Sequence, residues 1–290
     1  MTQTSPPSKL RGFLVLARAS NLPTVWSNCL AGWLLGGGYD WPTWGLVVVC
    51  FGASCLYTGG MFLNDAFDLD FDRQFRPERP VPSGLISART VWVSGSLLLL
   101  IGTSALAWFG PVTALLTVLL VAMILAYDAV HKKTILSPLL MGACRFLLYL
   151  VAASVVTAVS GFAIWSALVL ALYIAGLSYI AKAESAPGPL RYWPLILLAG
   201  PIVLAWIVND FNYRQNGIIL SCIFAAWTVW SLRHIFWAKT KNIGATVSGL
   251  LAGIVLVDLL AVGAFQLEVV LPFVAFFVIA RLFQKVIPAT

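Results

Sequence analysis

The chain has 290 residues, of which 60% are hydrophobic and 10% are charged, and its mean hydropathy is +0.93. Ordinary soluble domains carry roughly 25% charged residues, so this composition excludes a soluble globular protein and indicates a polytopic membrane protein. Basic residues that fringe membrane spans explain the formal net charge of +7, so we expect no nucleic-acid partner.

Apolar stretches that approach the length of a membrane span recur along the whole chain. A spanning helix needs about 20 residues. The stretches run over residues 13–38, 43–63, 90–109, 111–127, 135–159, 162–182, 193–209, 217–238, 246–265 and 269–286. Very short connectors separate the third from the fourth and the ninth from the tenth, so each pair is either a hairpin or one broken helix. We expect an all-α, polytopic transmembrane bundle of nine or ten spans that forms a single domain over residues 1–290.

Basic residues gather in alternate connectors of the predicted bundle. The groups that contain Lys9, Arg73, Lys132, Lys182 and Lys239 fall on one side, and the connectors on the other side carry almost none. Cytoplasmic loops of membrane proteins are enriched in Lys and Arg. We therefore expect this side to face the cytoplasm, and we expect an integral protein of the bacterial inner membrane.

An acidic run stands where the second apolar stretch leaves the membrane. Asn64, Asp68 and Asp72 are spaced at i, i+4 and i+8, so they share one face if the helix continues. Asp65 joins this face, and Asp70 points away from it. Stacked carboxylates repel one another unless a cation lies on them, and Mg²⁺ is usually held by one or two carboxylates together with substrate phosphates. The run predicts a site for Mg²⁺ and a diphosphate; the alternative is a solvated helix end with local ion pairs.

Polar residues also lie inside the apolar stretches. Arg145 is well within the fifth stretch and Asp258 is near the middle of the ninth. Charged residues at such depth normally face a cavity or a partner, so we expect Arg145 to line a cavity. Asp258 either forms hydrogen bonds between helices or is linked to Arg145 or to a path for protons or an acceptor. Arg18 and Asn21, one turn apart, are candidates for contact with an acceptor or a diphosphate.

Two sequence motifs carry a resemblance to a known family. Residues 64–72 read Asn-Asp-x-x-Asp-x-x-x-Asp, and residues 79–84 read Arg-Pro-Val-Pro-Ser-Gly. This pair resembles the signature of the UbiA superfamily of intramembrane prenyltransferases. Residues 16–21 resemble the Arg-containing first helix of that family, and Tyr127 followed by Lys132 and Lys133 resembles its Tyr-x4-Lys element. The resemblance implies a helical bundle, commonly of nine spans, around a central cavity with a cytoplasmic polar cap.

The resemblance weakens where the family carries a second Asp-rich motif. The corresponding residues 178–185 contain one acid, Glu184, and no Asp. Glu184 is a candidate metal ligand, and Lys182 is a candidate for the positive charge that a second Mg²⁺ would bring. The alternative is that both are ordinary interface charges. This segment, with residues 253–258, is similar to the UbiA-like EboC proteins.

The predicted substrate has an anionic head group and an apolar tail. A prenyl diphosphate fits a pocket within the bilayer whose mouth carries Mg²⁺ and basic side chains, and aromatic faces can stabilise an allylic cation. We expect a Mg²⁺-dependent prenyltransferase for an aromatic or lipid-like acceptor; an intramembrane terpene cyclase and a non-catalytic carrier of a lipid-like metabolite are the alternatives. The candidate residues are catalytic Asp68, Asp72 and Lys132; metal-binding Asn64, Asp65, Asp68, Asp72 and Glu184; and substrate-binding Arg18, Asn21, Arg79, Tyr127, Lys132, Lys133, Arg145, Tyr173, Tyr179 and Lys182.

Overall fold

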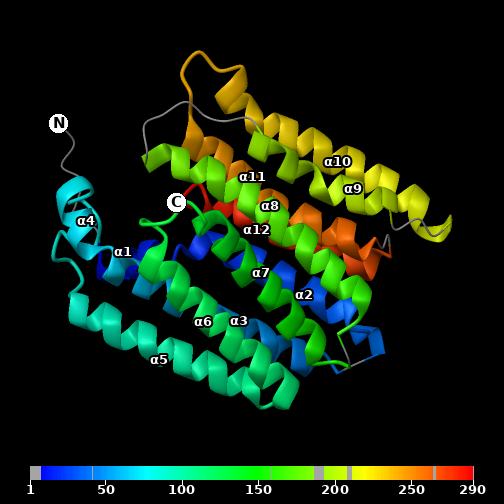
Figure 1. Ribbon diagram of the computed structural model, residues 1–290, viewed down its shortest axis with the longest axis horizontal. Helices are drawn as coiled ribbons and strands as arrows, with labels where there is room; N and C mark the ends of the chain where they lie inside the picture. The colour runs from blue at the N-terminus through cyan, green and yellow to red at the C-terminus, as the bar shows by residue number, and fades with distance from the viewer. Residues whose placement is uncertain are drawn as a thin grey trace.

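The computed structural model describes residues 8–40, 42–157, 159–185, 193–207, 211–263 and 266–289, and the side chains at 183–185 and 211–213 lie outside this description. Helices form most of the described chain, and these residues contain no strand (Figure 1). The prediction of an all-α bundle is confirmed.

The helices follow one another in the order that the apolar stretches indicate. They are α1 (Lys9–Leu16), η1 (Ala19–Asn21), α2 (Leu22–Leu35), η2 (Gly38–Asp40), α3 (Thr43–Phe67), α4 (Leu69–Phe75), α5 (Ala88–Ala107), α6 (Pro111–Val130), α7 (Ser137–Ser154), α8 (Gly161–Ser185), η3 (Trp193–Ala199), α9 (Gly200–Ile207), α10 (Phe211–Phe236), α11 (Ile243–Val262) and α12 (Leu267–Phe283). Seven of these helices, α3, α5 to α8, α10 and α11, are long and apolar enough to cross a membrane.

Three of the ten predicted stretches form shorter helices. α2 and α12 have 14 and 17 residues, and η3 with α9 forms a short apolar segment over residues 193–207. The pairs with very short connectors, α5 with α6 and α11 with α12, are separate helices that pack against each other.

The first apolar stretch is not one continuous helix. α1 ends at Leu16, α2 begins at Leu22, and Arg18 between them has a left-handed backbone with φ 42° and ψ 49°. Pro23 lies in the first turn of α2, where a proline is tolerated because that turn needs no N–H donor. A helix running through this point would lose a hydrogen bond and meet the proline ring. The apolar stretch over residues 13–38 therefore forms two helices joined by a turn at Arg18.

Glycines bring α3 and α5 into close contact. A Cβ added at Gly102 would lie 2.7 Å from the backbone oxygen of Gly52, and one at Gly59 would lie 2.9 Å from that of Gly95. Small residues let membrane helices approach and pack by van der Waals contact. This contact fixes α3 and, with it, the acidic run at its C-terminal end.

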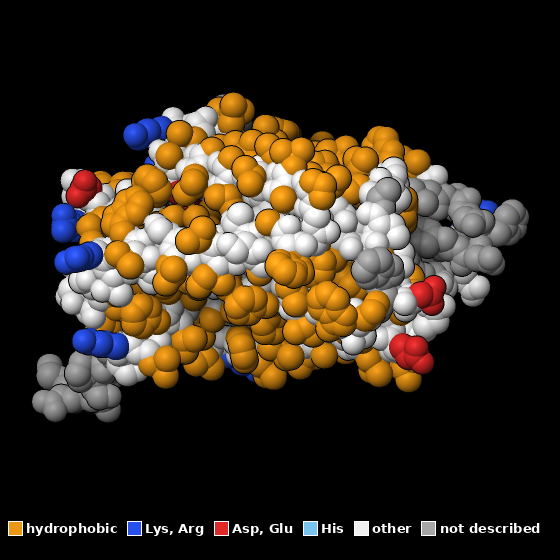
Figure 2. Space-filling model, turned by 90° about the horizontal axis from the view of Figure 1, so that it is seen from below, with side chains coloured by type: hydrophobic (Ala, Val, Ile, Leu, Met, Phe, Trp, Pro, Cys, Tyr) orange, Lys and Arg blue, Asp and Glu red, His pale blue; other side chains and the backbone are white. Residues whose placement is uncertain are grey.

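The surface carries a broad apolar belt between two polar ends (Figure 2). Lys and Arg side chains gather at one end of the face shown. Large apolar side chains point outward from several helices; Leu100, Val118 and Val229, for example, are 64%, 54% and 54% exposed. A soluble protein rarely exposes so large an apolar area, so the belt fits a lipid environment.

Candidate functional site

The acidic run forms a corner at the end of α3. α3 ends at Phe67 and α4 begins at Leu69, but the backbone N–H of Asp72 still donates to the carbonyl of Asp68 at 2.9 Å. The chain therefore stays close to helical, and Asp65, Asp68 and Asp72 are all buried. The Asp70 side chain is 93% exposed and pairs with Arg73 at 3.4 Å. The predicted division between a buried acidic face and an outward Asp70 matches this geometry.

Basic side chains from two other segments lie on the buried acids. Arg79 Nη1 is 2.8 Å from Asp72 Oδ2 and 3.3 Å from Asp65 Oδ1. Lys132 Nζ, from the loop after α6, is 2.9 Å from Asp68 Oδ2 and 3.9 Å from Asp72 Oδ1. These paired acids and bases, Asp65, Asp68, Asp72, Arg79 and Lys132, form a compact charged layer at the mouth of the site.

The pKa of Asp68 reflects this layer. Burial raises the pKa of the Asp68 carboxyl, but the hydrogen bonds and charges of His131 and Lys132 outweigh burial and hold the pKa below its usual value. His131 Nε2 lies 3.3 Å from the same Asp68 oxygen. Asp68 is therefore a stable carboxylate at neutral pH.

The donor set suits Mg²⁺ in its chemistry. Carboxylate and amide oxygens from Asn64, Asp68 and Asp72 are the ligands that a hard cation prefers. The Oδ1 atom of Asp72 is buried and accepts no hydrogen bond from any described residue. Among the described residues, no group of three or more acidic, His or Cys side chains is arranged to hold a metal ion. Arg79 and Lys132 instead pair with the carboxylates of Asp72 and Asp68. A metal ion would have to displace part of these pairs.

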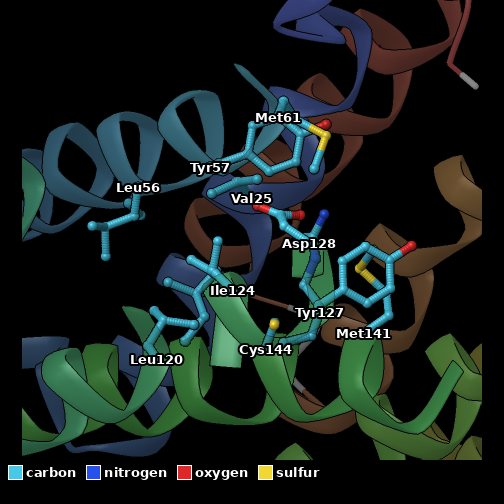
Figure 3. Close-up of a pocket in the computed structure, with 14 residues that line it drawn as sticks. Val25, Leu56, Tyr57, Met61, Leu120, Ile124, Tyr127, Asp128, Met141 and Cys144 are labelled. Carbon is cyan, nitrogen blue, oxygen red and sulfur yellow. The ribbon is translucent and has the colours of Figure 1, made fainter. Parts of the chain in front are cut away.

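An apolar pocket lies beside the charged layer, between α2, α3, α6 and α7 (Figure 3). It encloses roughly 570 Å³ of empty space when its open mouth is counted. Its lining is Val25, Ala53, Leu56, Tyr57, Gly60, Met61, Leu120, Ile124, Tyr127, Asp128, Met141, Cys144, Arg145 and Leu148. The predicted cavity residues Tyr127 and Arg145 are both in this set.

Arg145 is held in the pocket wall by a buried polar network. Its Nη1 donates to Asn28 Oδ1 at 2.5 Å and to the backbone oxygen of Thr24 at 3.2 Å. Asn28 Nδ2 in turn donates to both carboxylate oxygens of Asp258, at 2.7 and 3.0 Å, and Ser27 donates to Asp258 at 2.5 Å. Asp258 thus bonds between helices and is also linked to Arg145, with Asn28 as the bridge.

Arg18 and Asn21 lie at the break between α1 and α2. Burial lowers the pKa of Arg18, but the charge of Asp65 and its neighbours outweighs burial and raises the pKa above its usual value. Arg18 therefore stays a cation and interacts with Asp65 of the charged layer. Asn21 Nδ2 donates to the backbone oxygen of Ala289 at 2.9 Å, so Asn21 anchors the C-terminal segment.

The structure does not bring the remaining candidates to the pocket. Tyr173 is fully buried in another part of the core, where its hydroxyl donates to Leu250 at 2.8 Å. Its role as a cavity aromatic is not supported, because α8 turns this side chain toward α11. Tyr179 contacts the Trp193 ring instead.

Three further candidates, Lys182, Lys133 and Glu184, form no described contact with the acids. Lys182 Nζ donates to Thr134 at 2.7 Å and to Ser137 Oγ at 3.2 Å, so it secures the loop between α6 and α7. Lys133 is exposed. Glu184 lies in the last turn of α8, and its side chain is outside the described residues.

Two residues of the site were not among the predicted candidates. Asp128 lines the pocket and accepts a hydrogen bond from Asn64 Nδ2 at 3.1 Å. His131 approaches Asp68, and its ring stacks on Tyr127 at a centroid distance of 4.9 Å. The signal in the sequence was their position, because both lie within four residues of Tyr127 and Lys132, the residues of the recognised motif.

A layer of buried carboxylates and cations beside an apolar pocket, inside a helical membrane bundle, defines an intramembrane protein suited to a ligand with an anionic head and an apolar tail. The chain belongs to the UbiA prenyltransferase family, whose model matches residues 22–286. The predicted family is confirmed. The match to a particular subfamily, EboC, stays a prediction.

Two relatives are about a third identical to the chain over less than half of its length. The digeranylgeranylglyceryl phosphate synthase of Ignicoccus hospitalis is 32% identical over 126 residues, covering 43% of this chain and 41% of that protein. The 4-hydroxybenzoate octaprenyltransferase of Paracidovorax citrulli is 32% identical over 134 residues, covering 39% of this chain and 45% of that protein. The matched part spans less than half the length of either relative.

Solved structures share the fold over almost the whole chain. A structure of digeranylgeranylglyceryl phosphate synthase has a TM-score of 0.60 at 18% identity and covers 94% of this chain and 98% of that chain. A UbiA homologue from Archaeoglobus fulgidus bound to GPP and Mg²⁺ has a TM-score of 0.58 at 15% identity and covers 94% and 97%. At this identity the likeness establishes the fold alone. Together with the family match and the apolar helices, it makes the chain an integral membrane protein.

Proposed function

We propose that the chain is a Mg²⁺-dependent prenyltransferase that moves a prenyl group from a prenyl diphosphate to an aromatic or lipid-like acceptor. The observation that carries the proposal is the charged layer of Asp68, Asp72 and Lys132 beside an apolar pocket. The layer suits the diphosphate, and the pocket suits the prenyl chain.

The acids and bases of the layer have complementary roles in this reaction. Asn64, Asp68 and Asp72 would hold Mg²⁺, which when bound supplies positive charge to the diphosphate. Lys132 and Arg79, released from their carboxylate partners, would then face the phosphate oxygens. Arg18 adds a third cation on the same side. These side chains stabilise the charge that grows on the leaving group.

The transfer itself takes place at the border between the layer and the pocket. The acceptor forms a bond to C1 of the prenyl group, the C1–O bond breaks with its electron pair going to the diphosphate, and the proton of the acceptor passes to water at the mouth. Tyr57 and Tyr127 line the pocket, and their ring faces can stabilise positive charge on the allylic carbon. Asp68, Asp72 and Lys132 are the residues on which departure of the diphosphate depends.

The names of the relatives support prenyl transfer and leave the acceptor open. One is named for synthesis of a glyceryl phosphate lipid and the other for transfer to 4-hydroxybenzoate. Structures of a UbiA homologue from Archaeoglobus fulgidus contain GPP and Mg²⁺ or DMAPP and Mg²⁺, which favours a prenyl diphosphate and a divalent metal here. We place the charged mouth on the cytoplasmic side of a bacterial inner membrane, since the basic residues gather at that end.

Purified protein tests this function directly. Incubation with Mg²⁺ and a panel of prenyl diphosphates and acceptors should release diphosphate and yield a prenylated product, both followed by mass spectrometry. Asp68→Asn should lower product formation at least 100-fold, because it removes a carboxylate of the layer. Asp70→Asn, the exposed neighbour, is the matched control and should stay within about threefold of wild type. Equal losses in the two variants would contradict the proposed site.

A non-catalytic carrier is the second candidate, and one observation favours it. Arg79 and Lys132 already neutralise the buried acids, so the layer needs no metal to be stable. A carrier would bind the lipid-like ligand equally well with Mg²⁺ and with EDTA, and would release no diphosphate. Loss of binding in EDTA excludes the carrier.

A further inference from the structure

One buried acid at the wall of the pocket has no role in the reaction proposed above. Asp128 is 4% exposed and lies in the last turn of α6, four residues before Lys132. Its Oδ1 accepts the hydrogen bond from Asn64, whereas its Oδ2 is buried and has no hydrogen-bond donor among the described residues. A buried carboxylate oxygen that lacks a donor is costly. The position of Asp128 therefore makes sense if an occupant of the pocket supplies a donor.

The pocket itself offers little else to satisfy this oxygen. Most of the lining is aliphatic or aromatic carbon. The other charged residue of the lining, Arg145, directs its hydrogen bonds to Thr24 and Asn28 rather than to Asp128. Figure 3 shows the Asp128 carboxylate among the side chains that line the pocket.

A prenyl diphosphate is a poor partner for Asp128. Its hydrocarbon chain has no hydrogen-bond donor, and its diphosphate presents acceptor oxygens whose negative charge a carboxylate repels. The donor must therefore belong to the second substrate. Asn64 holds Oδ1 and so fixes the orientation of the carboxylate, which leaves Oδ2 for that substrate.

We propose that Asp128 Oδ2 binds the hydroxyl group of the acceptor, so that the acceptor belongs to the class of lipid-soluble molecules with a free hydroxyl group. The inference rests on the proposed prenyl transfer and adds the chemical class of the second substrate. Asp128 places this hydroxyl next to the charged layer, because its carboxylate accepts a hydrogen bond from Asn64 of the acidic run. An acceptor without the hydroxyl would leave the carboxylate oxygen unpaired and would bind weakly.

Matched probes test the inference by binding. 4-Pentylphenol and 1-decanol are compared with their methyl ethers, which keep the shape and lose the donor. Calorimetry is done in nanodiscs with Mg²⁺ and geranyl thiodiphosphate, a slowly reacting analogue whose binding is measured first. A hydrogen bond to a charged group contributes about 1.5–3 kcal/mol, so at least one hydroxyl probe should bind about 10- to 100-fold more tightly than its ether.

Two substitutions and a control assign this preference to Asp128. Asp128→Ala removes the acceptor, and Asp128→Asn keeps the size and an oxygen for Asn64 while turning an N–H₂ group toward the pocket. Both substitutions should reduce the ratio of hydroxyl-probe affinity to ether-probe affinity to about one. If Asp128→Ala does not fold, the result for Asp128→Asn alone tests the inference. Asp70→Asn, which alters an exposed acid outside the pocket, should keep the wild-type preference.

The outcomes separate this inference from the proposed function. If wild-type protein fails to bind geranyl thiodiphosphate, the proposed function fails and the inference fails with it. If the analogue binds but neither hydroxyl probe is preferred over its ether, the inference alone is overturned. The same holds if the preference survives in Asp128→Asn.

Discussion

Arg79 offers the sharpest test of the charged layer, because it holds two buried acids at once. Replacing it in Arg79→Met keeps most of the side-chain volume and leaves Asp65 and Asp72 without their 3.3 and 2.8 Å partner. Removing one member of a buried ion pair typically costs about 3–5 kcal/mol. Arg79 is 18% exposed and Lys132 remains near Asp72, so we expect the lower end, about 3 kcal/mol, which corresponds to a Tm lower by about 6–12 °C.

Mg²⁺ should reverse much of this loss. With Arg79 absent, the freed carboxylates bind the cation without first breaking an ion pair. A ligand that binds only the folded state at 100 times its Kd stabilises it by about 2.7 kcal/mol. The Tm of Arg79→Met should therefore rise more on addition of Mg²⁺ than the Tm of wild type does.

Tryptophan fluorescence in detergent, recorded at one fixed scan rate with EDTA or with Mg²⁺, measures both effects. Arg73→Met is the matched control, because the Arg73–Asp70 pair is exposed and such pairs contribute less than about 1 kcal/mol. Two results would refute the reasoning: equal destabilisation by the two substitutions in EDTA, or an equal Mg²⁺ shift in wild type and Arg79→Met.

Three further predictions test other parts of the site. Glu184→Gln should weaken the Mg²⁺ dependence of prenyl diphosphate binding more than Lys182→Gln does, because Glu184 is the only acid of its segment; an unchanged calorimetric titration in Glu184→Gln would leave it outside the metal site. The pKa of Asp68 is lower in the folded state than its unfolded value of about 3.9, so its pairing stabilises metal-free protein above about pH 4 and is lost as pH falls through the folded pKa. Lys132→Gln should therefore flatten the fall of Tm below about pH 4, and an unaltered pH profile would contradict this pairing. Asp258→Leu removes the acceptor of buried hydrogen bonds and should cost about 1–3 kcal/mol, measured as Tm, while geranyl diphosphate binding stays within about threefold; a loss of binding without a loss of Tm would place Asp258 in the ligand site.

The helices and the acidic face were predictable because both depend on local rules. A bilayer requires spans with internally satisfied backbones, so apolar length alone locates most helices. The acids at positions 65, 68 and 72 share a face because helical spacing is fixed over so short a segment. The contacts of Arg79 and Lys132 with these acids depend instead on how separate segments pack, which spacing does not determine.

Aromatic and buried polar residues were harder to place. Tyr173 and Tyr179 lie on α8, where core and lipid-facing sides are both apolar, so hydropathy does not say which side faces the pocket. Asn28, which bridges Arg145 and Asp258, carries no motif. Its role depends on α2 packing against both α7 and α11, and the sequence of a single helix does not determine which helices it contacts.

The central claim is that the acids beside the pocket bind Mg²⁺ together with a prenyl diphosphate. Electron–nuclear double resonance on protein loaded with Mn²⁺ in place of Mg²⁺ and with geranyl thiodiphosphate tests it most directly, since direct coordination of phosphate gives a strong ³¹P hyperfine coupling to Mn²⁺. The coupling should be present in wild type and in Asp70→Asn and absent in Asp72→Asn. A wild-type spectrum without ³¹P coupling, or an unchanged coupling in Asp72→Asn, would contradict the claim.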